Sequence, residues 1–186
     1  MAARYEIRLG GSGGQGLILA GVILGEAASI FDGKNAVQTQ SYGPEARGGM
    51  SKSDVIIGDD EIDYPKAYRP DLLLALTQAS FNGYVKDVKE GGLVVYDTGL
   101  VKEVKEGNYR LVGLPIIETA TKEVGKSMVA NIVSLGAIVE LTSIVTKEAA
   151  EKSLMGRAPR GTEEINRKAL HAGYELVRKQ LAGEKA

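Results

Sequence analysis

Glycines near the N-terminus have the spacing of a phosphate-binding turn. Gly11, Gly13 and Gly16 follow the pattern Gly-x-Gly-x-x-Gly, between an apolar run and a segment with helical periodicity. Glycine allows a tight turn and lets backbone N–H groups approach a phosphate, while the following helix N-terminus adds positive potential. The turn residues that we expect to bind a cofactor are Gly11, Gly13, Gly14, Gln15 and Gly16.

The acidic residue that a dinucleotide site needs on the next strand is missing. A carboxylate about 20 positions after the glycines binds the ribose hydroxyls in such sites. Here the corresponding segment is Gln38-Thr39-Gln40-Ser41, which contains no acid. NAD binding is therefore the weakest interpretation. Binding of another phosphate or nucleotide and close packing of a helix on a sheet both remain open.

A second unusual segment reads Ser41-Tyr42-Gly43-Pro44-Glu45-Ala46-Arg47-Gly48-Gly49. Its glycines and proline predict an ordered loop and not a helix. Arg47 and exposed amides could bind an anionic ligand or a partner chain, and a solvated turn is the alternative. The loop residues that we expect to face a partner or ligand are Ser41, Tyr42, Gly43, Pro44, Glu45, Arg47, Gly48 and Gly49.

The remaining chemical groups form weaker patterns. Gly125-Lys126-Ser127 imitates the end of a P-loop, but Ala120 stands where that motif requires glycine. His171 is the only histidine and falls in a helical segment, so we expect no catalytic triad. The acidic run at 59–63 is typical of a solvated loop, and Asp97 could face a ligand or cap a turn. We therefore expect neither a catalytic centre nor a metal site in this chain.

Composition limits the classes of protein further. The 186 residues predict one domain spanning 1–186, and 23 Lys+Arg against 24 Asp+Glu give a net charge of −1, against a globally basic nucleic-acid binder. The chain has no cysteine, which excludes thiolate-held iron–sulfur clusters within it. No apolar run is long enough to cross a membrane, and the N-terminal residues lack a signal-peptide pattern, so we expect a cytoplasmic protein.

Strand and helix patterns alternate along most of the chain. The expected strands are 5–9, 35–40, 53–57, 71–76, 93–96 and 109–114. The expected helices are 17–30, 78–89, a buried helix at 127–141, 147–155 and an amphipathic helix after Thr162, with a helix start or irregular turn at 115–123. Such alternation predicts a three-layer α/β/α fold, with a Rossmann-like, mostly parallel or mixed sheet of about six strands.

Taken together, the two loop motifs resemble the gamma subunit of 2-oxoacid:ferredoxin oxidoreductases. The resemblance rests on Gly11-Ser12-Gly13-Gly14-Gln15-Gly16, on the loop 41–49, and on Asn131 with Leu135-Gly136-Ala137 in the buried helix. It covers nearly the whole chain. The form of the second motif is most similar to the 2-oxoglutarate branch, with the pyruvate, 2-ketoisovalerate and indolepyruvate branches as alternatives.

The resemblance implies a role within a larger enzyme. Enzymes of this family decarboxylate a 2-oxoacid on thiamine diphosphate, pass electrons through iron–sulfur clusters to ferredoxin, and release an acyl-CoA. Thiamine diphosphate, Mg and the clusters would belong to partner subunits, namely alpha, beta and, as an open point, delta. This chain would be a non-catalytic subunit that packs on the catalytic subunits and shapes the CoA side through the two loops and Asn131. We expect it to dimerise when isolated.

The residues alone also allow a different class of protein. An independent Rossmann-like protein that binds a nucleotide or CoA would need the same glycine turn. Such a binder would be monodisperse and gain thermal stability with its ligand, whereas a subunit would expose apolar surface near its glycine loops.

Overall fold

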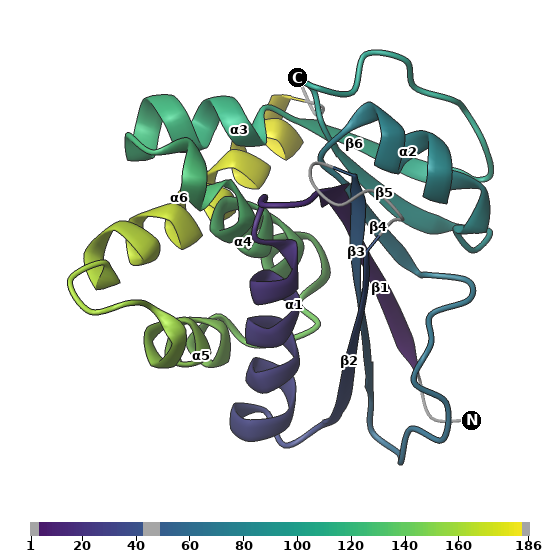
Figure 1. Cartoon of the computed structure of the whole chain (residues 1–186), viewed down its shortest axis with the longest axis horizontal. Helices are drawn as coiled ribbons and strands as arrows, with labels where there is room; N and C mark the ends of the chain where they lie inside the picture. Colours follow the sequence, from purple (N-terminus) through teal and green to yellow (C-terminus); the bar gives the residue numbers. More distant parts are fainter. Residues whose placement is uncertain (1–3, 43–48, 184–186) are drawn as a thin grey trace.

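The apolar runs form one sheet in the computed structural model, which describes residues 4–42 and 49–183 (Figure 1). In this part of the chain the strands are β1 (Tyr5–Ser12), β2 (Asn35–Tyr42), β3 (Met50–Gly58), β4 (Leu72–Ala75), β5 (Gly92–Asp97) and β6 (Tyr109–Leu114). Their order is β2-β3-β1-β4-β5-β6. Pairings β1–β4, β4–β5 and β5–β6 are parallel, and β3 is antiparallel to both β1 and β2. The sheet is therefore mixed, as expected.

The strand β3 separates β1 from β2. It pairs along nearly its whole length with both, from Tyr5↔Ile57 to Ser12↔Met50 on one side and from Asn35↔Gly58 to Tyr42↔Ser51 on the other. β1 and β3 are longer than the sequence pattern predicts, because Gly10 and Gly11 continue the ladder against Lys52 and Ser51. The end of β1 and the start of β3 consequently lie side by side.

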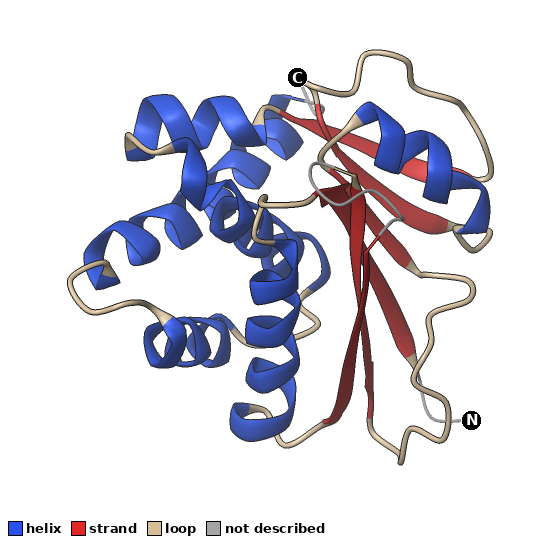
Figure 2. Ribbon diagram, viewed as in Figure 1, coloured by secondary structure: helices blue, strands red, loops and turns tan. Residues whose placement is uncertain are grey.

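Helices cover the two faces of the sheet unequally (Figure 2). One face carries α1 (Leu17–Glu26), which continues as a π-helical turn over 27–31, together with α3 (Ile116–Thr119), α4 (Ala130–Thr142), α5 (Lys147–Arg157) and α6 (Glu163–Gly183). The other face carries α2 (Gln78–Tyr84), followed by a 3₁₀ turn over 85–87. The segment 115–123 forms α3 and a π-helical turn, and 127–129 is a 3₁₀ turn that leads into α4.

The thicker helical layer contains the main core. Ile7 and Leu9 of β1 and Val55 of β3 are buried there against α1 and α4. Every residue of α4 from Ala130 to Val139 is buried, as an apolar helix without a polar face must be. A Cβ on Gly136 would lie 2.2 Å from the backbone oxygen of Leu170, so α4 and α6 touch through their backbones.

The opposite face is covered by a helix over only part of its width. α2 begins with a capping box in which Thr77 and Ser80 exchange side-chain and backbone hydrogen bonds, and Phe81 packs in a smaller core over β4 and β5. Over β1, β3 and β2 the polypeptide between β3 and β4 takes its place, since Arg8 and Thr39 both donate to its backbone carbonyls. In the described residues no helix is long and apolar enough to cross a membrane.

Candidate loop site at the strand ends

The glycine turn joins the carboxyl end of β1 to α1. Gly14 has φ +91° and Gly16, which precedes the first residue of α1, has φ +72°, so both adopt left-handed backbone that favours glycine. A Cβ on Gly16 would lie 2.6 Å from Nδ2 of Asn131, and that same Nδ2 donates to the Gly16 carbonyl over 3.1 Å. Asn131 in α4 therefore holds the entry into α1.

Gln15 stabilises the turn from within. Its side-chain Oε1 accepts a hydrogen bond from the backbone N–H of Ser12 over 2.8 Å. The backbone N–H of Gln15 donates to the Ser12 carbonyl oxygen over 3.2 Å. A Cβ on Gly11 would lie 2.4 Å from this Oε1, so only glycine leaves room for the folded-back side chain. Gln15 and Gly11 thus shape the turn, and the side-chain Oε1 of Gln15 already accepts a hydrogen bond from within the chain.

The two loops are joined by a direct hydrogen bond. The Gly13 amide donates to the Gly49 carbonyl over 3.0 Å, next to the pair Ser12↔Met50. Ser41 and Tyr42 end β2 at the same edge, although β3 lies between them and β1. The loop residues Gly43, Pro44, Glu45, Ala46, Arg47 and Gly48 lie outside the described residues.

Backbone donors available to a ligand are correspondingly few. The Ser12 and Gly13 amides are used by Gln15 and Gly49. Of the turn, the amides of Gly14 and Gly16 have no acceptor among residues 4–42 and 49–183. β2 itself contains no carboxylate, so this strand does not supply the ribose partner of a dinucleotide site.

Apolar surface surrounds the turn. A hollow of about 280 Å³ is lined by Gly14, Gln15, Ile117, Ser127, Met128 and Ala130. A second hollow of about 200 Å³ shares Met128 and extends to Leu19 and Ile165. Met128 is 85% exposed and Leu19 is 39% exposed. Shallow hollows rimmed by exposed apolar side chains are typical of a surface that contacts another chain.

Comparison with known proteins agrees with the motifs. Residues 6–176 match the sequence model of the family "Pyruvate ferredoxin/flavodoxin oxidoreductase". The chain is 52% identical over 177 residues to the 2-oxoglutarate synthase subunit KorC of Methanocaldococcus jannaschii, covering 94% of this chain and 95% of that protein.

The chain belongs to the pyruvate ferredoxin/flavodoxin oxidoreductase family.

A solved structure and a relative named for a different substrate are also similar to this chain. The crystal structure of a keto/oxoacid ferredoxin oxidoreductase gamma subunit from Geobacter sulfurreducens PCA superposes with a TM-score of 0.85 at 55% identity, covering 94% of this chain and 99% of that one. The pyruvate synthase subunit PorC of Thermotoga maritima is 30% identical over 94% of this chain and 95% of that protein. The resemblance to gamma subunits that the two motifs indicated is confirmed.

The structure also shows the contacts of Asp97 and His171, two residues considered from the sequence as chemical groups. Asp97 is fully buried, and its two oxygens accept from the Leu100 and Ile117 amides over 2.8 and 2.9 Å. It therefore caps the end of β5 and the start of α3. His171 is 55% exposed and lies 3.5 Å from Glu151. Among residues 4–42 and 49–183 no three His, Asp or Glu side chains are grouped to hold a metal ion.

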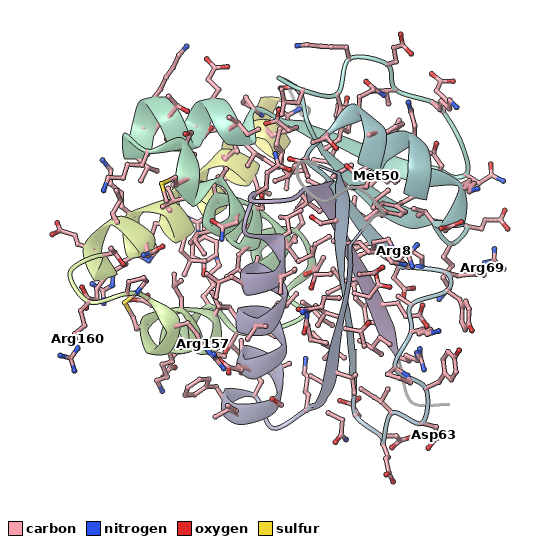
Figure 3. The ribbon with its side chains drawn as sticks, viewed as in Figure 1. Arg8, Met50, Asp63, Arg69, Arg157 and Arg160 are labelled. Carbon is pink, nitrogen blue, oxygen red and sulfur yellow. The ribbon has the colours of Figure 1, made fainter. Side chains whose placement is uncertain are left out.

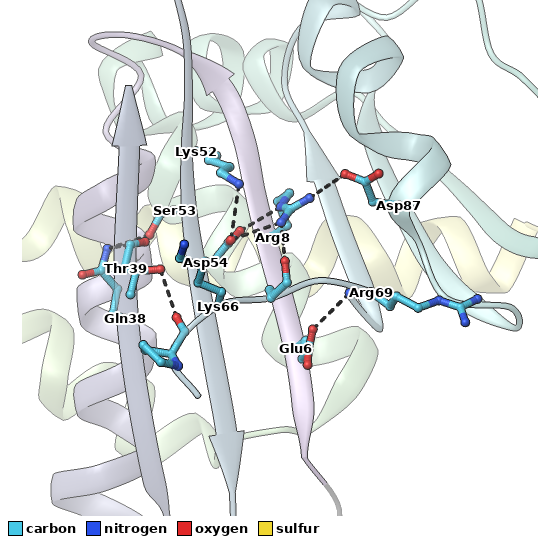
Figure 4. Close-up of polar contacts among 12 residues, drawn as sticks. Glu6, Arg8, Gln38, Thr39, Lys52, Ser53, Asp54, Lys66, Arg69 and Asp87 are labelled. Atoms are coloured by element: carbon cyan, nitrogen blue, oxygen red, sulfur yellow. Dashed lines mark hydrogen bonds and ion pairs between the residues drawn. The ribbon is translucent and has the colours of Figure 1, made fainter. Parts of the chain in front are cut away.

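The sequence patterns missed a buried ionic cluster on the α2 face of the sheet (Figure 4). Arg8 of β1 donates from Nε and Nη2 to both oxygens of Asp54 on β3, over 2.8 and 3.2 Å, and from Nη1 to Asp87 over 2.9 Å. It also donates to the Ala67 carbonyl. Burial lowers the pKa of Arg8, but the bonds and charges of Asp54 and Asp87 outweigh this and raise it above its ordinary value.

This cluster ties four segments together: β1, β3, the turn after α2, and the polypeptide between β3 and β4. Figure 3 shows Arg8 inside the molecule, whereas Arg69, Asp63 and Arg160 project from its surface. The signal in the sequence was a charged residue next to apolar residues within each of two strands, Arg8 in YEIRLGGS and Asp54 in MSKSDVIIG. A charge in a buried part of a strand indicates a partner, because an unpaired buried charge is costly.

Proposed function

We propose that this chain is the gamma subunit of a multi-subunit 2-oxoacid:ferredoxin oxidoreductase that acts on 2-oxoglutarate. The observation that carries the proposal is the 52% identity to a 2-oxoglutarate synthase subunit along almost the full length of both chains. The complex would convert 2-oxoglutarate and CoA to succinyl-CoA and carbon dioxide, with the electrons passing to ferredoxin. The pyruvate and ketoisovalerate branches, to which more distant relatives belong by name, are the alternatives.

The chemistry belongs to other subunits in this proposal. The chain has no cysteine, so its residues do not fit an iron–sulfur cluster, which needs thiolate ligands. Thiamine diphosphate with its Mg ion would likewise sit in alpha or beta subunits, with a delta subunit as a further cluster carrier. The role of this chain is then to bind and orient its partners in the cytoplasm, as a single domain.

We further propose that the glycine turn and the loop 41–49 face the catalytic subunits and the path of CoA. Two features support this. The loops are hydrogen-bonded to each other at one edge of the sheet, and exposed Met128 and Leu19 lie beside them. The amides of Gly14 and Gly16 are the donors that a phosphate of CoA would use there. Arg47 would meet an anionic group or a partner carboxylate, and Glu45 a partner amide or base.

Assembly with the partner subunits tests the proposal. The tagged chain would be purified from its native cells without oxygen, and viologen reduction would be measured with several 2-oxoacids and CoA. We expect thiamine- and cluster-binding chains to co-purify and 2-oxoglutarate to be the best substrate. Another best substrate would assign another branch. A chain that emerges alone, monodisperse and stabilised by nucleotides or CoA would instead be an independent binder.

Two variants locate the contact surface. Met128→Glu places a charge at an 85% exposed apolar position beside the turn. Ile30→Glu does the same at a 66% exposed position in the π-helical turn that follows α1. We expect Met128→Glu alone to reduce co-purification by about tenfold, because a buried interface charge is costly. Equal effects would contradict this placement. Arg47→Ala with unchanged assembly and unchanged CoA kinetics would contradict the role of the second loop.

A further inference from the structure

A groove of about 630 Å³ lies on the face of the sheet that carries α2. Its floor is formed by side chains of β1, β2 and β3, and one wall by residues 65–68. The other wall is formed by Gly83, Tyr84, Lys86 and Asp87. It shares no lining residue with the hollows around Met128. The groove is thus a separate feature from the loop site, although Ser41 at the end of β2 reaches into it.

The paired charges at the floor and at the foot of the α2-side wall balance. Arg8 is paired with Asp54 and Asp87, and Nζ of Lys52 lies 3.6 Å from Asp54. These four side chains contribute two positive and two negative charges. Figure 4 shows them converging between β3 and the turn after α2. A negatively charged ligand would therefore meet a neutral, ordered floor.

The rim of the groove carries positive charge that no residue among 4–42 and 49–183 balances. Lys66 and Lys86 line the groove from its two walls and are exposed. Neither forms an ion pair with a residue that the structure describes. The groove as a whole thus has an excess of two positive charges, although the chain has a net charge of −1. This excess matches a ligand that carries two negative charges.

An aromatic side chain and hydroxyl groups supply the remaining contacts. The centroid of the Tyr84 ring lies 5.3 Å from the guanidinium carbon of Arg8 and 5.8 Å from Nζ of Lys52. Burial raises the pKa of Tyr84, so its hydroxyl stays protonated and able to donate. Ser41 and Tyr68 bring further hydroxyls to the lining. This combination suits a phosphate group attached to an organic body.

We propose that this groove binds a small organic phosphate of about two negative charges. The ammonium groups of Lys66 and Lys86 hold the phosphate, and Tyr84 packs against the organic part. The volume lies within the range of about 300–1,000 Å³ that small-molecule sites occupy. Sheet, helix turn and the 65–68 segment bound the groove on three sides, which fits a compact ligand better than an extended acidic peptide.

Calorimetric titration of the purified full chain tests the assignment. The probes are AMP, inorganic phosphate and a hexaglutamate peptide, each at about 50 mM and about 0.5 M salt, because salt screens exposed charge pairs. We expect AMP to bind more tightly than inorganic phosphate and to weaken at high salt. Lys66→Glu with Lys86→Glu should weaken AMP binding by about tenfold, corresponding to about 1.4 kcal/mol for two lost surface pairs.

The matched control is Lys105→Glu with Lys168→Glu, which changes the net charge equally at two exposed lysines outside the groove. An equal loss in this control would show attraction by overall charge and overturn the site. No binding of AMP would do the same. Equal affinity for AMP and inorganic phosphate would refute recognition of an organic body. Binding of hexaglutamate without AMP would replace the proposal by an acidic peptide partner.

Discussion

Replacing Arg8 by methionine is expected to destabilise the fold more than the loss of any exposed ion pair. Arg8 and Asp54 are each 4% exposed, and Arg8 provides the bonds that neutralise the Asp54 carboxylate. Methionine keeps the length and the apolar stem of the side chain but removes the guanidinium. Among residues 4–42 and 49–183, the cation that remains near the buried Asp54 carboxylate is then Lys52, 3.6 Å away.

The size of the effect follows from this burial. Removing one partner of a buried ion pair costs about 3 to 5 kcal/mol, because the other charge remains desolvated. The unfolding entropy of a chain of 186 residues is about 390 cal/mol/K near the transition. The melting temperature should therefore fall by roughly 8 to 13 °C.

Thermal unfolding followed by circular dichroism measures this change. The matched control is Arg157→Met, which breaks the exposed pair with Glu26 and should cost at most about 1 kcal/mol. The double variant Arg8→Met with Asp54→Leu should recover at least half of the loss, because no buried charge is left unpaired at Asp54. An Arg8→Met melting temperature no lower than that of Arg157→Met would refute the reasoning, as would a double variant less stable than the single one.

Three further predictions concern glycines and one surface carboxylate. Gly16→Ala should cost roughly 1 to 3 kcal/mol in chemical denaturation, because alanine is strained at φ +72°, whereas Gly156→Ala, with open space at its Cβ, should cost nothing. Gly136→Ala should likewise cost about 1 to 3 kcal/mol by forcing α4 and α6 apart, and equality with Gly156→Ala would contradict this contact. The hydrogen bond from Arg157 lowers the pKa of Glu26 below 4.5, so its stabilisation is complete above that pH and is lost as pH falls through the lower folded-state value. Glu26→Gln should thus unfold with a weaker dependence on pH in this acidic range, and an unchanged profile would count against the pair.

The elements of the fold could be predicted because each has a local cause. The Pro70 boundary and the run Leu72–Ala75 mark a buried strand, and Thr146 caps α5 as its side chain accepts from the Ala149 amide. Helix ends were less accurate. A single helix was expected over 17–30, but the α-helix ends at Glu26 and a π-helical turn follows it. The periodicity of apolar residues does not distinguish a π-helical turn from an α-helix.

The candidate site was predictable only in part. The glycine spacing located the turn, and its meeting with the second loop became visible through the Gly13–Gly49 bond. The role of Gln15 was not predictable, because it depends on the side chain folding back over Gly11. Ser41 was grouped with the loops but reaches into the groove on the α2 face, since alternate residues of a strand point to opposite faces.

By itself the sequence determined the family, the α/β class and the absence of cysteine ligands for an iron–sulfur cluster, because these depend on residue types and on short-range spacing. Only the tertiary structure decided that β3 lies between β1 and β2. It also decided that Arg8 binds Asp54 and Asp87, which are 46 and 79 residues away from it in the sequence. The physical reason is that strand order and ion pairing depend on which distant surfaces bury one another. No local pattern of residues encodes that choice.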